Sequence, residues 1–156
     1  MSTNDTNNYV ALALSTEATN QYDSVTQRLN EQKGIRFLHA SLGLLTEAGE
    51  LADIIKKQLF YGKPIDLPNL IEELGDIEWY LAIFKSELAL QLNSTPAEIE
   101  SRIRSININK LQLRYPDKFT ESDAVNRNLE AEQALLSSAV ADLTEEGALN
   151  QESNHA

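Results

Sequence analysis

Residues 47–76 read EAGELADIIKKQLFYGKPIDLPNLIEELGD, and this stretch predicts a helical hairpin that carries an acidic site. It begins with Glu47-Ala-Gly-Glu50 and ends with Glu73-Leu-Gly-Asp76, so each string places two carboxylates three residues apart. On a helix such residues project from roughly the same face. A turn signal, Tyr61-Gly62-Lys63-Pro64, lies near the middle, so the two helices are expected to run antiparallel with their acidic pairs at similar height.

Four converging carboxylates without a cationic partner repel one another unless a cation neutralises them. All-oxygen ligation of this kind suits Mg²⁺, with Mn²⁺ as an alternative. The simpler alternative is a solvated acidic surface, because 24 acids in 156 residues produce such pairs by chance. Two pairs placed symmetrically about one turn favour a metal-dependent site for phosphate chemistry. Gly49 and Gly75 are expected at close helix packing, since glycine costs roughly 1 kcal/mol relative to alanine inside a helix.

Composition narrows the class of protein. The content of hydrophobic residues is 42% and that of charged residues 24%, as in soluble globular domains, and there is no cysteine for disulfides or thiolate sites. The polar N-terminus is unlike a signal peptide and no apolar run is long enough for a membrane span, so we expect a cytoplasmic protein without a membrane partner. The net charge of −11 argues against a nucleic-acid partner.

Apolar residues recur at helical spacing and strand signals are nearly absent, so the fold class predicted is all-α, a bundle of four to five helices. Helices are expected from about 8 to 29, 34 to 60, 67 to 92, 96 to 114 and 120 to 137, with Thr95-Pro-Ala-Glu98 as a capping box. The two hairpin helices are expected to bury these apolar stripes: Phe37, Leu44, Leu51, Ile55 and Leu59; Leu70, Leu74, Ile77, Leu81, Phe84 and Leu88. The organisation expected is an N-terminal helical region at 1–33, a catalytic helical core at 34–119, a C-terminal helix at 120–140 and an acidic, disordered tail at 141–156.

The residues also carry a family resemblance. Thr46-Glu47-Ala-Gly-Glu50, followed after twenty-two residues by Glu73-Leu-Gly-Asp76, resembles the metal-binding signature of the MazG-like all-α nucleoside triphosphate pyrophosphohydrolases. Downstream, Asn107-Ile-Asn-Lys110-Leu-Gln-Leu-Arg114-Tyr-Pro116 resembles a second segment common in that family. The resemblance covers roughly residues 34 to 120, and the two motifs are specific in this order and register.

The resemblance implies hydrolysis of a nucleoside triphosphate between the α- and β-phosphates, which gives a monophosphate and pyrophosphate. It assigns Mg²⁺ ligation to Glu47, Glu50, Glu73 and Asp76, and it implies a homo-oligomer, a dimer or tetramer. Rival activities within the class are those of a phosphoribosyl-ATP pyrophosphatase or a narrow dUTP or dCTP pyrophosphatase. From other classes, a non-catalytic helical interaction module and a cation-binding protein without turnover stay open.

One position departs from the pattern of the family. Many members carry a glutamate directly before the first motif acid, and in some it is proposed as the general base. Here that position holds Thr46. Either metal polarisation of the water suffices, or another carboxylate such as Glu72 or Asp53 assists.

Other residues are candidates for contact with the nucleotide, each with a structural alternative. His39 either contacts the nucleotide, as a histidine near this position does in similar proteins, or is a half-buried histidine. Tyr80 is one turn beyond Asp76 and either lines the base pocket or packs in the core. Trp79 is expected elsewhere, in the core or in an oligomer interface.

Basic side chains supply candidates for phosphate binding. Lys57 lies on the same side of its helix as Glu47 and Glu50, where it is placed to bind the terminal phosphates. Lys110 and Arg114 are one turn apart and either grip phosphate oxygens or form a solvated basic face near the helix end. The resemblance favours substrate binding for Asn107 and Lys110, whereas Arg114 is expected either to bind substrate or to anchor the turn.

Overall fold

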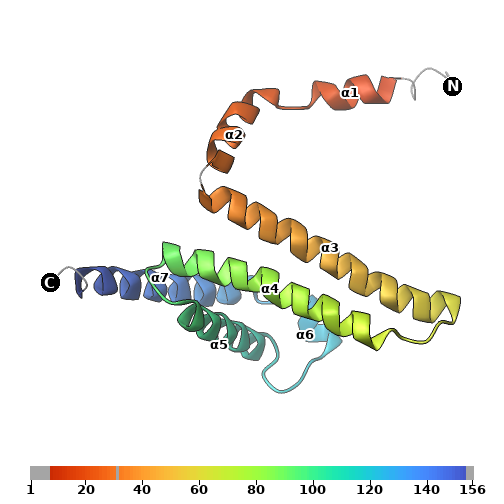
Figure 1. Cartoon of the computed structure of the whole chain (residues 1–156). Coiled ribbons are helices and arrows are strands. Elements are labelled where there is room, and N and C mark those ends of the chain that lie inside the picture. The colour runs from red at the N-terminus through yellow and green to blue at the C-terminus, as the bar shows by residue number, and fades with distance from the viewer. Residues whose placement is uncertain (1–7, 31, 154–156) are drawn as a thin grey trace. The chain divides into compact units, whose positions relative to one another are not determined.

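The computed structural model describes residues 8–30 and 32–153, and within these residues it contains helices and no strand (Figure 1). The predicted all-α fold class is therefore confirmed. Residues 1–7 of the expected N-terminal region and residues 154–156 of the expected tail lie outside the described residues. None of the described helices is long and apolar enough to cross a bilayer. The α-helices are α1 (Tyr9–Ser15), α2 (Tyr22–Asn30), α3 (Gln32–Tyr61), α4 (Leu67–Gln91), α5 (Pro96–Arg114), α6 (Glu121–Val125) and α7 (Leu129–Ser153).

The chain divides into two compact units, Met1–Ile35 and Arg36–Ala156. The described part of the first unit holds α1 and α2, and a 3₁₀ turn at Thr19–Gln21 leads into α2. This turn interrupts the helical region that was expected from about 8 to 29. The second unit holds nearly all of α3 and every later helix, and it contains the acidic strings.

Local capping signals define the turn between α3 and α4. Gly62 follows the last residue of α3 with a φ of 63°, a left-handed conformation that glycine adopts without strain. The Lys63 N–H then donates to the Lys57 carbonyl at 3.3 Å, which closes the helix end. The Asp66 carboxylate accepts the backbone N–H of Asn69 at 3.3 Å and caps α4. The expected turn at residues 61–64 is confirmed.

Side-chain contacts hold α3 against α4 at the end away from the turn. The rings of Phe37 and Phe84 pack with centroids 5.4 Å apart. Arg36 donates to Glu87 at 3.0 Å, and this carboxylate is only 3% exposed. These contacts join positions 47 and 51 residues apart in sequence, so they fix the antiparallel pairing of the hairpin.

The glycine at the close approach of the two helices is Gly43. A β-carbon there would overlap the Tyr80 ring, so the ring occupies the space that the glycine leaves. Gly49 and Gly75 were expected in this role, but a β-carbon at either would meet no atom within 4 Å. That expectation is wrong for the single chain, because both glycines face away from the contact between α3 and α4.

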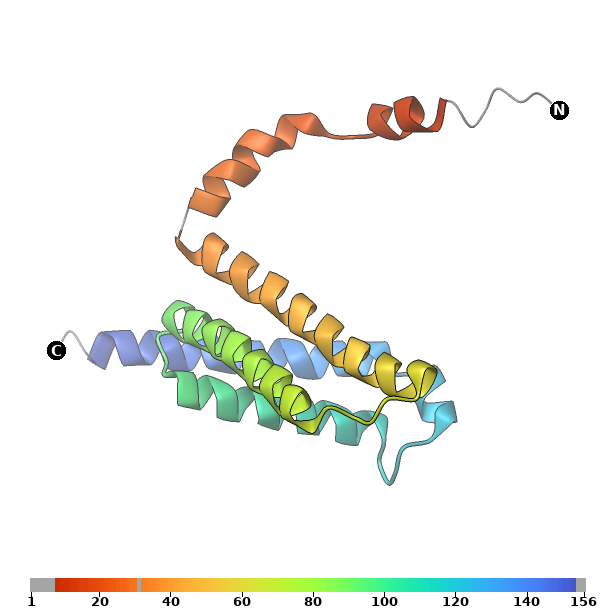
Figure 2. The same ribbon diagram turned by 45° about the vertical axis from the view of Figure 1, so that its right-hand side comes forward.

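Helix α5 packs on α4, and α7 packs on α5, so the three lie side by side (Figures 1 and 2). The predicted capping box begins α5: the Glu98 N–H donates to Thr95 Oγ1 at 3.3 Å, and the Thr95 N–H donates to Glu98 Oε2 at 2.9 Å. Ile99, in the first turn of α5, is 2% exposed and belongs to the core. The cap thus places a core residue against the neighbouring helices.

The C-terminal segment differs from the single helix expected between 120 and 137. Thr120 caps the short α6, and the chain then breaks before Asn128, whose side chain accepts the Ala131 N–H at 3.1 Å and starts α7. Helix α7 continues to Ser153, through most of the segment at 141–156 for which we expected disorder. Contacts with other elements order this segment, because Glu146 pairs with Arg102 and Gly147 lies against the carbonyl of Leu92.

The core of the single chain is small. Among the described residues, the hydrophobic residues that are buried number four: Ala40, Ile54, Ala89 and Ile99. Three residues of the expected apolar stripes, Ile55, Leu59 and Leu74, are instead exposed. The outer faces of the hairpin carry further exposed apolar side chains: Leu38, Leu42 and Leu45 on α3; Leu67 and Ile71 on α4.

Candidate metal centre

Three carboxylates converge between the hairpin helices. Glu47 of α3 and Glu73 and Asp76 of α4 each offer an oxygen, and these atoms lie within 4.8 Å of one another. Glu73 is buried at 4% exposure, Glu47 is half-buried and Asp76 is exposed, so the cluster opens from the interior to solvent. The structure brings together three of the four carboxylates that the sequence singled out.

The fourth carboxylate, Glu50, acts on the cluster from the next turn of α3. The pKa of Glu73 is raised to about 7, first because burial disfavours its charged form, and then because of Glu47 and Glu50. Within the described residues, no lysine or arginine forms an ion pair with any of these four acids. The cluster therefore requires a proton or an added cation to relieve its repulsion.

The donor atoms of the cluster fit a hard divalent cation. All are carboxylate oxygens, the ligands that Mg²⁺ and Mn²⁺ prefer in proteins. Glu47, Glu73 and Asp76 can supply three ligands, whereas Glu50 stands outside this group and acts on it through its effect on Glu73. The exposure of Asp76 leaves room for water or substrate oxygens in the remaining positions.

An aromatic cluster lies on the side of the acids away from the turn. The His39 ring meets Tyr80 edge-on at 5.6 Å and Trp79 edge-on at 6.0 Å between centroids. Trp79 and Tyr80 themselves lie 4.8 Å apart, and Trp79 is 54% exposed. The sequence predicted His39 and Tyr80 as nucleotide contacts but placed Trp79 elsewhere. Trp79 and Tyr80 are adjacent on α4, and adjacent side chains of a helix point about 100° apart, so the sequence alone does not place them together. Their shared contact with His39 of α3 shows that both rings belong to one cluster.

The candidates for the general base differ in their surroundings. Asp53 lies between two lysines, with Lys56 Nζ at 2.6 Å and Lys57 Nζ at 2.8 Å. The hydrogen bonds from both ammonium groups lower the pKa of Asp53 to about 2, which makes it a poor proton acceptor. Glu72 is exposed and forms no ion pair within the described residues.

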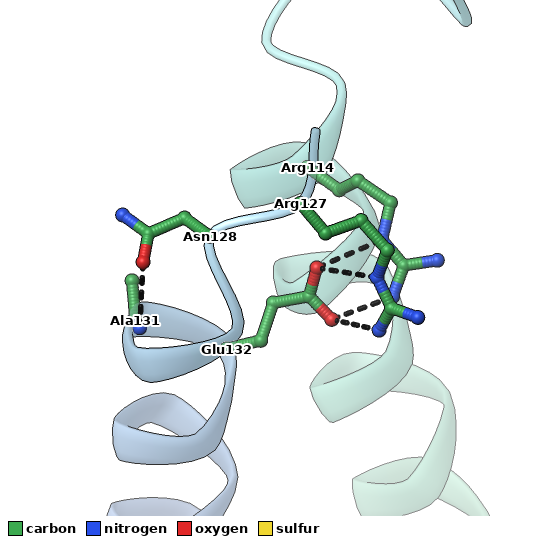
Figure 3. A network of polar contacts seen from close by, with 5 residues as sticks. All are labelled: Arg114, Arg127, Asn128, Ala131 and Glu132. Carbon is green, nitrogen blue, oxygen red and sulfur yellow. Dashed lines mark hydrogen bonds and ion pairs between the residues drawn. The ribbon is translucent and has the colours of Figure 1, made fainter. Parts of the chain in front are cut away.

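Arg114 is bound to a residue outside the expected core. Its Nε and Nη2 donate to the Glu132 carboxylate at 2.9 and 2.5 Å, and Arg127 donates to the same two oxygens at 3.2 and 2.6 Å (Figure 3). The two guanidinium groups lower the pKa of Glu132 to about 2. Of the two roles expected for Arg114, this geometry matches the anchoring one, since it ties the end of α5 to the start of α7.

The other two residues of the downstream motif, Asn107 and Lys110, lie on α5. Asn107 is exposed and Lys110 is half-buried. No hydrogen bond or ion pair within the described part of the chain joins them to the acidic cluster. Asn107 and Lys110 are therefore not members of the acidic cluster, and their contact with the substrate stays a prediction.

The fold and the site together define an all-α protein with a carboxylate cluster on a helical hairpin. Residues 37–119 match the family described as the MazG nucleotide pyrophosphohydrolase domain. The chain therefore belongs to this family, as its motifs indicated, and it is a nucleotide pyrophosphohydrolase in the general sense of that description. Members of the family are typically metal-dependent, in agreement with the acidic cluster.

A curated relative extends the comparison. The Gene 37 protein of Mycobacterium phage L5 is 33% identical over 93 residues, which cover 57% of this chain and 75% of the relative. The name of this phage protein states no activity, so the similarity indicates kinship and no substrate. No solved structure matches the chain significantly.

Proposed function

We propose that this protein hydrolyses nucleoside or deoxynucleoside triphosphates between the α- and β-phosphates in a Mg²⁺-dependent reaction. The products are a nucleoside monophosphate and pyrophosphate. The observation that carries the proposal is the position of Glu73, which is buried beside Glu47, Glu50 and Asp76 and has no cationic partner among the residues that the structure describes. Such a cluster suits a reaction whose substrate arrives as a complex with divalent cations.

In the proposed site, Glu47, Glu50, Glu73 and Asp76 would hold the Mg²⁺. When bound, the ion supplies neutralisation of phosphate charge and acidification of a water. The oxygen of the attacking water bonds to the α-phosphorus, the bond from that phosphorus to the bridging oxygen breaks, and pyrophosphate leaves. Glu72 is the remaining candidate to accept the proton of the water, because Asp53 is neutralised by two lysines.

The aromatic cluster is the proposed place for the nucleoside. Tyr80 lies one turn beyond Asp76, so a base stacked there would keep the α-phosphate near the acids. His39 and Trp79 provide two further rings around the same position. This cluster accepts a planar base without specifying one, which leaves dUTP, dCTP and phosphoribosyl-ATP as alternative substrates.

We also propose that the protein is a homo-oligomer, a dimer or tetramer. Leu38, Leu42 and Leu45 are spaced by four and three residues, so they share one face of α3, and each is at least 44% exposed. Soluble chains rarely leave such a continuous apolar strip in water. A second copy of the hairpin would cover it and would help to enclose the nucleotide.

The direct test is a panel of nucleotides incubated with Mg²⁺ and assayed for pyrophosphate and orthophosphate. It should include the four common ribo- and deoxyribonucleoside triphosphates, dUTP and phosphoribosyl-ATP. We expect pyrophosphate as the first product for at least one compound, and its loss in Glu50→Gln and Asp76→Asn. Glu78→Gln is the matched control, because this glutamate is 70% exposed and lies on the same helix outside the cluster.

Two outcomes would reject the proposal. Orthophosphate as the first product would show that a different bond is cleaved. No turnover across the panel, together with unchanged partner binding in Glu50→Gln, would favour the non-catalytic interaction module.

A further inference from the structure

A surface pocket lies at the end of the hairpin where the turn joins α3 to α4. Its volume is about 290 Å³, and it is lined by Ile54, Lys57, Lys63, Pro64, Asp66 and Asn69. Pockets for whole drug-sized ligands span about 300–1,000 Å³, so this one suits a small polar group rather than a complete nucleotide.

The pocket begins one helical turn from the acidic cluster. Ile54 follows Glu50 by four residues, and Asn69 precedes Glu73 by four residues, a rise of about 6 Å on each helix. The aromatic cluster lies in the opposite direction, beyond Asp76. A nucleotide with its base on the aromatic rings and its α-phosphate at the acids would therefore extend its remaining phosphates towards this pocket.

Two cationic residues, Lys57 and Lys63, line the pocket. The hydrogen bond from the Lys63 N–H to the Lys57 carbonyl fixes the backbone of these two residues next to each other at the end of α3. The Lys57 Nζ forms an ion pair with Asp53 Oδ2 at 2.8 Å. Lys63 forms no ion pair in the part of the chain that the structure describes, so its charge is available to a ligand.

The one acid in the lining, Asp66, has another partner. Its carboxylate accepts the backbone N–H of Asn69 as the cap of α4. The partial positive charge at that helix end offsets part of its repulsion of an anion. The Asn69 side chain adds an amide donor at the wall nearest the acidic cluster.

We propose that this pocket is the subsite for the β- and γ-phosphates, the pyrophosphate that leaves, and that Lys63 is its principal cation. The inference rests on the proposed function, because it assumes that the α-phosphate lies at the acidic cluster. It assigns the loop of the hairpin a role in selecting triphosphates and in retaining the product. Lys57 and Asn69 complete the subsite from the two helices.

The test compares Lys63→Ala with Lys56→Ala and Lys63→Arg. Lys56→Ala removes the same charge from α3 at a position that does not line the pocket. Calorimetry with inorganic pyrophosphate and Mg²⁺ gives the dissociation constant of each variant, and thermal unfolding verifies that each is folded. We expect the dissociation constant of pyrophosphate to increase by about tenfold or more in Lys63→Ala, because this variant loses one charge-assisted hydrogen bond. The dissociation constants of Lys56→Ala and Lys63→Arg should change little.

Steady-state kinetics with a nucleoside triphosphate that the protein hydrolyses supply the second measurement. Lys63→Ala should raise KM and the inhibition constant of pyrophosphate together, whereas inhibition by the nucleoside monophosphate should stay unchanged. Equal pyrophosphate affinity in Lys63→Ala and Lys56→Ala, or no pyrophosphate binding by the parent protein, would overturn the subsite. If pyrophosphate binding depends on Lys63 but no nucleotide is hydrolysed, the subsite stands and the proposed function fails.

Discussion

The ring of Tyr80 on α4 fills the space that Gly43 leaves open on α3. A β-carbon at position 43 would overlap the ring, so the two residues interlock across the hairpin. The same ring meets His39 edge-on and lies one turn beyond Asp76. This single contact therefore sets both the approach of the two helices and the position of an aromatic ring beside the acidic cluster.

Replacing Gly43 by alanine should displace the Tyr80 ring. Alanine alone would favour the helix by about 1 kcal/mol, but overpacking of this kind costs about 1–3 kcal/mol, so we expect a net loss of up to about 2 kcal/mol. The KM for the nucleotide should rise, because the ring leaves its place in the aromatic cluster. Chemical denaturation and steady-state kinetics measure the two effects.

Gly49→Ala is the control for this substitution. It changes the same residue type in the same helix, where the added methyl group meets no atom of the chain. Its free energy of unfolding should rise by about 1 kcal/mol. A similar KM increase in both variants would mean that the effect of Gly43→Ala does not act through Tyr80.

Glu73→Gln should have opposite effects on stability without and with metal. Without a divalent cation, removal of the buried charge relieves repulsion from Glu47 and Glu50, so the melting temperature should rise. With Mg²⁺, the variant should lose most of the stabilisation that the parent protein gains, and its turnover should fall on the order of 10²-fold or more. Scanning calorimetry with and without Mg²⁺ measures both stability effects. A melting temperature that responds to Mg²⁺ equally in both proteins would contradict ligation by Glu73.

The helices and their ends could be predicted from the sequence because the signals are local. Asp66 caps α4 through a residue three positions away, and the capping box of α5 joins Thr95 to Glu98. The acidic strings could be placed opposite each other because a single turn, marked by Gly62 and Pro64, relates the two helices. In these cases a few neighbouring residues contain the whole physical cause.

Contacts between distant residues could not be predicted in this way. Glycines 43, 49 and 75 are equivalent in helix propensity, and only the pairing of α3 with α4 shows that Gly43 is the one in contact. Likewise, nothing near Arg114 in the sequence identifies Glu132, eighteen residues later, as its partner. The last part of α7 contacts Arg102 on α5 and Leu92 in the turn after α4, both far away in sequence.

The Glu132 ion pairs predict a defined acid sensitivity. The pKa of Glu132 is lowered from 4.5 to about 2 by its hydrogen bonds to Arg114 and Arg127. A carboxyl group whose pKa is lower in the folded state stabilises the fold above its unfolded pKa. The contribution should therefore be complete above pH 4.5 and should disappear as the pH falls towards 2.

The measurement is the free energy of unfolding against pH for the parent protein and Glu132→Gln. At neutral pH the variant should be less stable, and the two curves should converge below pH 4.5. Glu130→Gln is the control, because this exposed glutamate lies two residues earlier and forms no ion pair within the described residues. A difference between parent and Glu132→Gln that does not depend on pH would contradict the ion-pair origin.

Substitution of Leu45 by lysine should weaken self-association. Leu45 is 71% exposed in the single chain and lies on the strip with Leu38 and Leu42. If a second copy covers this strip, each chain loses about 1.5–3 kcal/mol of apolar burial, which weakens association by at least about tenfold. Sedimentation equilibrium measures the change, with Val140→Lys on α7 as a control of similar chemistry outside the hairpin. A parent protein that is monomeric at all concentrations, or equal association in both variants, would exclude this face of α3 as the oligomer contact.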